Sequence, residues 1–135
     1  MTTSVILVLI SFVVLAVAWT MRKQRGFHIA GMSMVMLFDV CFPIYLYLTH
    51  DWWKRLIEHG ELFSFLIWSH LICIIILYAL YVLQVLAGRA LLTNASADEY
   101  ERARDEHQKQ FLGIVLVRLL VFSTGALLIV PAGTG

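Results

Sequence analysis

The chain has 135 residues, of which 61% are hydrophobic and 14% are charged, with a formal net charge of +1 and a mean hydropathy of +0.84. An ordinary soluble domain is about half apolar and roughly one quarter charged, so this composition excludes a water-soluble globule. The near-neutral charge and the lack of a phosphate-neutralising basic patch also exclude nucleic acid as a partner.

Four apolar segments set the expected fold. Each reaches or approaches the ~20 residues that a helix needs to cross a ~30 Å hydrocarbon core. We expect spans over residues 4–21, 28–50, 62–88 and 108–131, with a cytoplasmic surface helix over about 98–107 leading into the last span. The sequence therefore predicts an all-α integral membrane protein, a single domain over residues 1–135 with four transmembrane helices in an antiparallel bundle. Too little chain remains for a soluble catalytic domain.

Basic residues fix the expected orientation of these spans. No positively charged side chain precedes the first span and basic residues follow it directly, which is typical of a retained anchor and not of a cleaved signal. The loops after the first and third spans carry seven basic residues, against two in the loop after the second. The seven are Arg22, Lys23, Arg25, Arg89, Arg102, Arg104 and Lys109, and the two are Lys54 and Arg55. We therefore expect both termini outside and the first and third loops in the cytoplasm.

One face of the second span is polar. At 100° per residue, a sector of about 80° holds six side chains in order of depth. They are His28, Met32, Met36, Asp39, Pro43 and His50. We expect this face to point into the bundle and not toward lipid.

The fourth span repeats part of this arrangement. His107 and Arg118 are eleven residues apart, as are His28 and Asp39, so each charged residue lies about 16 Å deeper than its histidine. An uncompensated charge at mid-membrane costs at least ~2.5 kcal/mol. We therefore predict an ion pair between Asp39 and Arg118, which either fixes helix register or lies beside a cofactor or proton path.

The histidines divide between the two membrane faces. His28 and His107 are expected at the cytoplasmic edge, and His50 and His70 toward the outer edge. Neutral imidazoles can ligate haem iron or copper, so His50 with His70, and His28 with His107, are candidate sites. The alternative is that interfacial histidines act only as amphipathic anchors, which explains His59 fully.

Spacing limits the metal chemistry. His28 and His50 are 22 residues or ~33 Å apart along the helix, too far for two stacked haems, so one haem near one face or a copper site fits better. The thioether of Met32 suits Cu(I), although Met at helical spacing more often packs a core. Cys41 and Cys73 lack the spacing of a zinc or disulfide framework and are expected to pack as small apolar residues.

Polar and small residues complete the pattern. Tyr81, Gln84 and Gly88 share a face with His70 and form a hydrogen-bonding face. The run Thr124-Gly125-Ala126 near the end of the fourth span should let another backbone approach closely. Ser96 or Asp98 is the expected N-cap of the last helix.

Several of these segments together resemble a known family. They are Phe27-His28-Ile29-Ala30-Gly31-Met32, Tyr45-Leu46-Tyr47-Leu48-Thr49-His50, Trp68-Ser69-His70-Leu71, His107-Gln108-Lys109 and Ser123-Thr124-Gly125. Their order and spacing resemble the YozB/CtaM-like small helical membrane proteins, over about residues 27–131. The resemblance marks His28, His50, His70 and His107 as the family's polar positions, and it implies assembly of haem–copper terminal oxidases.

These observations lead to one functional expectation and one alternative. We expect a multi-pass protein of a bacterial or archaeal cytoplasmic membrane that supports assembly or redox function of a respiratory haem–copper type complex through histidine-ligated haem or copper. Its partners would be the lipid bilayer and subunits of that complex. The alternative is a non-catalytic accessory subunit of a larger membrane complex. No nucleophile–base pair is apparent in the sequence, so we do not expect an enzyme.

Overall fold

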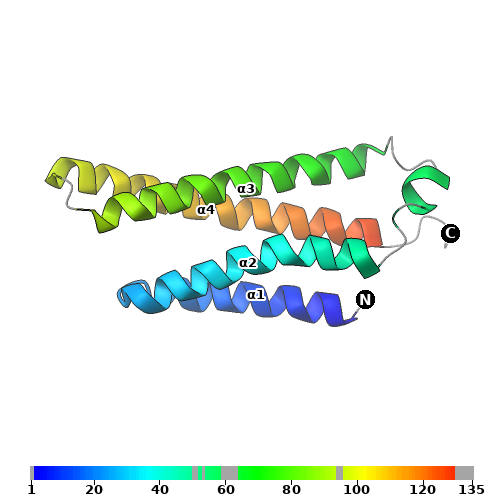
Figure 1. Cartoon of the computed structure of the whole chain (residues 1–135), viewed down its shortest axis with the longest axis horizontal. Helices are drawn as coiled ribbons and strands as arrows, with labels where there is room; N and C mark the ends of the chain where they lie inside the picture. The colour runs from blue at the N-terminus through cyan, green and yellow to red at the C-terminus, as the bar shows by residue number, and fades with distance from the viewer. Residues whose placement is uncertain (1, 50–51, 53, 59–63, 94–95, 130–135) are drawn as a thin grey trace. The chain divides into compact units, whose positions relative to one another are not determined.

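The computed structural model describes residues 2–49, 52, 54–58, 64–93 and 96–129. Four long helices account for most of them: α1 (Thr2–Thr20), α2 (Arg25–Thr49), α3 (Phe65–Leu92) and α4 (Ala97–Ile129), with a short π-helix, η1 (Lys54–Glu58), after α2 (Figure 1). All four long helices are long and apolar enough to cross a membrane. The expected all-α architecture with four candidate spans is confirmed to that extent.

The chain divides into two compact units, Met1–Glu61 and Leu62–Gly135. The first contains α1 and α2, and the second contains α3 and α4. In each unit the two helices run antiparallel and pack side by side along most of their length (Figure 1). Each unit is therefore a helical hairpin, as short connections between consecutive spans require.

The α1–α2 hairpin is held by very close packing of small residues. Ala18 is 0% exposed, and a Cβ added to Gly31 would lie 2.7 Å from the Ala18 Cβ. Only a residue without a side chain fits opposite Ala18, so α1 and α2 approach more closely here than larger residues would allow. Leu15 and Val35 are buried beside this contact.

The connection between α1 and α2 explains why α2 begins before its expected start at residue 28. Successive backbone hydrogen bonds, Met21 N to Val17 O (3.0 Å) and Gln24 N to Met21 O (2.9 Å), turn the chain within a few residues. The next bond, from His28 N to Gln24 O (2.9 Å), already belongs to the following helix. The basic residues at this turn therefore occupy the end of the hairpin and not an extended loop.

The α3–α4 hairpin has two differences from the expected boundaries. α3 continues to Leu92, four residues past the expected end of its span, and Arg89 lies in its last turn, where a positive charge complements the helix dipole. The expected surface helix is not a separate element, because α4 runs unbroken from Ala97 to Ile129. Its charged first part and its apolar part are one helix.

The start of α4 has a reciprocal cap. Ser96 N and Ser96 Oγ each donate to Glu99 Oε2 at 3.0 Å, and Glu99 N donates to Ser96 Oγ at 3.4 Å. This is the capping-box arrangement, so Ser96 and not Asp98 caps the helix. One turn before the apolar part begins, Lys109 Nζ contacts Asp105 Oδ2 at 2.6 Å on the exposed surface.

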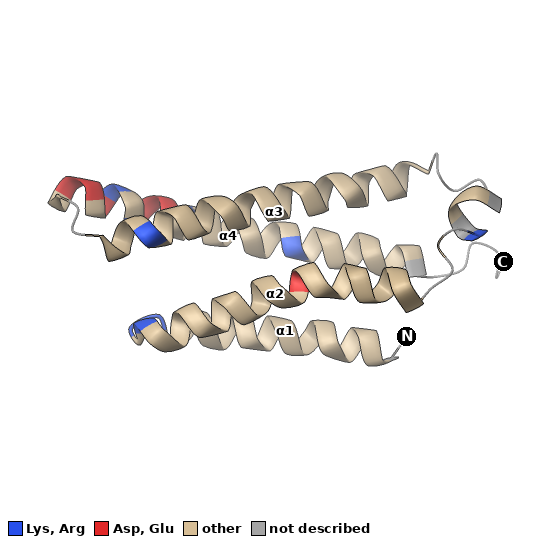
Figure 2. Cartoon of the chain, viewed as in Figure 1, with Lys and Arg blue, Asp and Glu red and all other residues tan. Residues whose placement is uncertain are grey.

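Charged residues are concentrated near helix ends, and the lengths of helix between them are mostly uncharged (Figure 2). Large apolar side chains on those lengths are exposed, for example Leu9, Val13, Ile75, Leu116 and Leu127, each at least half exposed. A water-soluble protein would not leave apolar surface of this extent uncovered. The exposed faces are suited to contact lipid or other membrane helices.

Candidate functional site

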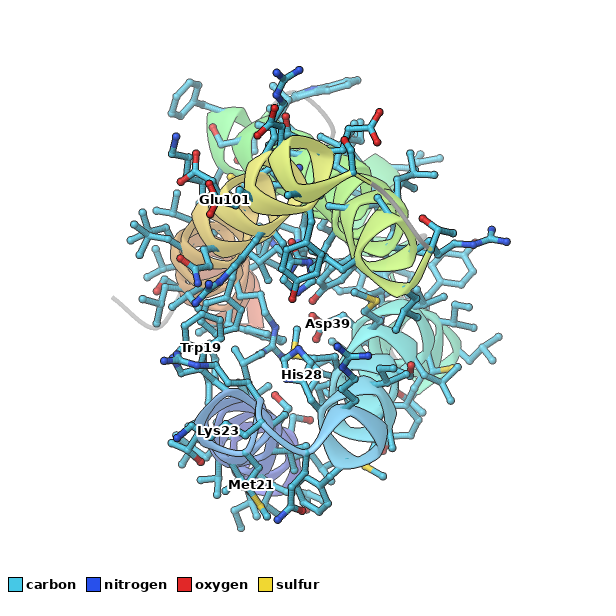
Figure 3. The ribbon with its side chains drawn as sticks, turned by 90° about the vertical axis from the view of Figure 1, so that its left-hand side faces the viewer. Trp19, Met21, Lys23, His28, Asp39 and Glu101 are labelled. Atoms are coloured by element: carbon cyan, nitrogen blue, oxygen red, sulfur yellow. The ribbon has the colours of Figure 1, made fainter. Side chains whose placement is uncertain are left out.

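The described residues of the predicted polar face of α2 are at least half-buried. Met32 and Asp39 are buried, and His28, Met36 and Pro43 are half-buried. Figure 3 looks along the helices and shows His28 and Asp39 on the same side of α2. Val35 and Phe42 are buried as well, so the inward face of α2 is wider and more apolar than the polar stripe alone. His50 lies outside the described residues.

His28 has a local structural role that the sequence did not reveal. Its Nδ1 lies 2.8 Å from the carbonyl oxygen of Ala18. That carbonyl belongs to the last turn of α1, where Arg22 N bonds to Trp19 O (3.2 Å). The last carbonyls of a helix lack partners inside the helix, so the imidazole caps α1. Because a carbonyl only accepts, His28 Nδ1 carries the proton of this hydrogen bond.

His70 is bound to the end of α4. Its Nδ1 lies 2.8 Å from Thr124 Oγ1. The threonine hydroxyl in turn donates to the carbonyl oxygen of Leu120 at 2.7 Å. Since the hydroxyl proton is directed to that carbonyl, the hydroxyl oxygen accepts from the ring and Nδ1 is the protonated nitrogen. His70 Nε2 therefore has the lone pair.

Gly125 makes room for the His70 ring. A Cβ on Gly125 would lie 3.1 Å from His70 Cε1, closer than ordinary van der Waals contact. The small residues Thr124-Gly125-Ala126 were expected to admit another backbone. At Gly125 the atoms nearest to an added Cβ belong to the imidazole of His70. The physical reason is that the missing side chain leaves space for a flat ring as readily as for a helix backbone.

His107 is bound to α3 near the opposite end of the hairpin. Its Nε2 lies 3.2 Å from Nε2 of Gln84. Gln84 is buried, with 3% of its surface exposed. An amide nitrogen only donates, so the lone pair of His107 Nε2 is the acceptor. The ring faces Gly88, where an added Cβ would lie 3.6 Å from His107 Cε1. The expected hydrogen-bonding face of α3 is thus in use, with His107 as a partner.

The two histidines of this hairpin occupy equivalent backbone positions. His70 precedes Gly88 by 18 residues on α3, and His107 precedes Gly125 by 18 residues on α4. In the antiparallel pair each histidine faces the glycine of the other helix. The two rings are therefore about 27 Å apart along the helix direction, near opposite ends of the pair.

Two buried charges lie in the middle of their helices. Asp39 is 4% exposed and Arg118 is 0% exposed, so both charged side chains are buried. The Arg118 guanidinium also lies 5.2 Å from the centroid of the Phe122 ring, one turn further along α4. This cation–π contact belongs to α4 itself and gives the guanidinium a favourable local neighbour.

Three expected pairs stay predictions. Asp39 with Arg118 and His28 with His107 each combine a residue of the first unit with a residue of the second, and His50 with His70 includes a residue outside the described part. His59 also lies outside it.

Within the described residues, no group of three or more His, Cys, Asp or Glu side chains could hold a metal ion. Cys41 is exposed and Cys73 is half-buried, both as free thiols.

Comparisons with protein-family models, with curated proteins and with solved structures found no match to this chain. The candidate site is therefore described from the hydrogen bonds of its own histidines. Sequence reasoning missed the partners Ala18, Thr124 and Gln84 of the three described histidines. The equal 18-residue spacing of histidine and glycine on α3 and α4 was the signal that could have shown which residues face one another.

Proposed function

We propose that this protein is a multi-pass protein of a bacterial or archaeal cytoplasmic membrane that supports assembly or redox function of a respiratory haem–copper type complex through histidine-ligated haem or copper. Its partners in this proposal are the bilayer and subunits of that complex, and its role is not enzymatic. The resemblance to the YozB/CtaM-like family is part of the proposal. The observation that carries it is the hydrogen bond between His70 Nδ1 and Thr124 Oγ1.

This hydrogen bond is typical of a metal ligand, because a metal-binding histidine almost always donates a hydrogen bond from the N–H of its other ring nitrogen to a fixed acceptor. The acceptor selects the tautomer and keeps the lone pair on Nε2. His28 has the same arrangement through the carbonyl of Ala18. A bis-histidine haem or a low-coordinate Cu(I) needs only two protein ligands. The proposal takes His70 as one of them and the predicted His50 as the second. A bound haem or copper would supply one-electron chemistry.

The expected result for cofactor binding is an optical spectrum that depends on His70. The full chain, purified from membranes in which haem and copper are abundant, should show a Soret band or contain copper. His70→Ala should lose that signal, and His107→Ala should keep it because the lone pair of His107 Nε2 already accepts from Gln84. A signal retained in His70→Ala and lost in His107→Ala would contradict the proposed ligand.

A non-catalytic accessory subunit is the second candidate, favoured by the structural hydrogen bonds of the histidines. His28 caps α1 and His107 joins α4 to α3, and both bonds would stabilise a hairpin without any cofactor. This function predicts a colourless, metal-free protein that co-purifies in fixed ratio with other membrane subunits. Mass spectrometry of the gently solubilised complex, measured beside the optical spectrum, separates the two candidates.

Orientation can be tested by labelling engineered cysteines in a background without Cys41 and Cys73. Ile57→Cys in η1 and Glu101→Cys in α4 both replace exposed side chains. Ile57 precedes α3 in the sequence and Glu101 follows it, so the two positions should lie on opposite faces of the membrane if α3 spans it. With both termini outside, a membrane-impermeant maleimide should label Ile57→Cys in intact cells and Glu101→Cys only after permeabilisation. The reverse pattern would show that the orientation is wrong.

A further inference from the structure

The two histidines of the α3–α4 hairpin have equivalent positions but different chemical surroundings. Each ring lies against a glycine of the facing helix, at Gly125 for His70 and at Gly88 for His107. Their hydrogen-bond partners differ in kind. His70 contacts a hydroxyl, whereas His107 contacts an amide nitrogen.

Thr124 completes a directed chain of hydrogen bonds. The ring Nδ1 donates to Thr124 Oγ1, and the hydroxyl donates to Leu120 O at 2.7 Å, with Val121 O at 3.1 Å as a second, longer contact. A hydroxyl has one proton. When that proton is donated to a helix carbonyl, the hydroxyl oxygen can only accept a hydrogen bond from the ring. With the hydroxyl oxygen as the acceptor, the ring proton of this hydrogen bond lies on Nδ1.

The glycines differ in how closely they approach the rings. An added Cβ would meet His70 Cε1 at 3.1 Å from Gly125 and His107 Cε1 at 3.6 Å from Gly88. The second value is ordinary contact, while the first requires the ring to move. Gly125 therefore determines the position of its ring, and Gly88 tolerates a methyl group.

We propose that Thr124 and Gly125 are positioning residues that make His70 Nε2 the ligand atom of this hairpin for haem iron or Cu(I), and that His107 is a hydrogen-bond partner of Gln84 and not a second ligand. The inference rests on the proposed function and narrows it. Of the two histidines that the hairpin places symmetrically, only the one held by a hydroxyl keeps its Nε2 lone pair for a metal. Thr124 and Gly125 act through His70 and do not themselves touch the metal.

The tautomer can be measured without any ligand. Full-length protein with ¹⁵N-labelled histidine, in lipid nanodiscs, should show a proton on Nδ1 of His70 and a lone pair on Nε2. Thr124→Val removes the hydroxyl at nearly constant shape and should give a mixture of His70 tautomers, whereas Thr124→Ser should restore the single form. The His107 signals should not change in either variant. Unchanged His70 signals in Thr124→Val would overturn the role of Thr124.

Ligand binding tests the second part with matched variants. Cu(I) held by a competing chelator, and haem in a separate titration, are added to the full chain. Loss of groups that orient a ligand typically weakens metal binding by about 10–100-fold, and we expect this range for Thr124→Val and Gly125→Ala. Gly88→Ala and His107→Gln should bind within a few-fold of the wild type. Equal weakening by Gly88→Ala and Gly125→Ala would overturn the assignment of His70 as the ligand.

The two experiments fail in different ways. If Thr124 controls the His70 tautomer as expected but neither haem nor Cu(I) binds, the proposed function is wrong and the ligand assignment falls with it, while the positioning of the ring stands. If haem or Cu(I) binds but the His70 tautomer is independent of Thr124, the proposed function stands and this inference is wrong.

Discussion

Asp39→Leu and Arg118→Met should each destabilise the protein by about 3–5 kcal/mol, and the double variant should lose less than either single one. Both residues are buried, and each lies at the middle of an otherwise apolar length of helix. Removing one member of a buried ion pair leaves the other charge without compensation. Removing both also removes the cost of taking two charges out of water, which offsets much of their attraction.

Thermal unfolding of the four proteins in the same detergent or nanodisc measures the cycle. Arg118→Met also removes the cation–π contact with Phe122, so Phe122→Leu serves as a control that reports the cost of losing that contact alone. After this correction, a strong favourable coupling supports a direct pair. Simple addition of the two losses would mean that Asp39 and Arg118 are not partners.

Gly31→Ala should be the most harmful single methyl addition in the α1–α2 hairpin. The new Cβ would lie 2.7 Å from the Ala18 Cβ, a distance that real structures do not tolerate, so the helices must separate. Overpacking of this kind typically costs about 1–3 kcal/mol. The hydrogen bond from His28 to Ala18 O, one turn from Gly31 on α2, should lengthen as the helices move apart.

Gly26→Ala is the matched control, because nothing lies within 4 Å of a Cβ at Gly26. Alanine there should leave stability unchanged or raise it by up to ~1 kcal/mol, since it restricts the unfolded chain. Unfolding temperature and reactivity of the α1–α2 turn to a protease measure both variants. Equal stability of Gly31→Ala and Gly26→Ala would show that the close approach of α1 and α2 does not exist.

The helices could be predicted because their apolar runs are long and contain few charges. The predicted helix boundaries differed from the structure where a helix continues through charged residues. The start of α2 at Arg25 depends on a tight turn through Gln24, which apolar periodicity does not report. The merger of the expected surface helix with the fourth span depends on Ser96 and Glu99, whose capping box starts one helix and is not followed by a stop signal.

The candidate site was predicted less completely, and the reason lies in its partners. Burial of Asp39 and Met32 was expected from their helical spacing, and for Asp39 also from the cost of exposing a charge to an apolar surrounding. The partner of His28 is a backbone carbonyl, which every residue carries, so the sequence gives no indication of it. Thr124 and Gln84 are recognisable polar residues, but pairing them with His70 and His107 requires the register of α3 against α4.

The central proposal, that a histidine of this protein ligates haem or copper, is tested most directly by the metal-to-protein ratio of the purified full chain. Elemental analysis for iron and copper, normalised to amino-acid analysis, should give about one metal per chain in the wild type if His70 belongs to a single site. The same preparation of His70→Ala should be nearly metal-free. A wild-type chain without metal when purified from haem- and copper-replete membranes, or an equal ratio in His70→Ala, would contradict the account.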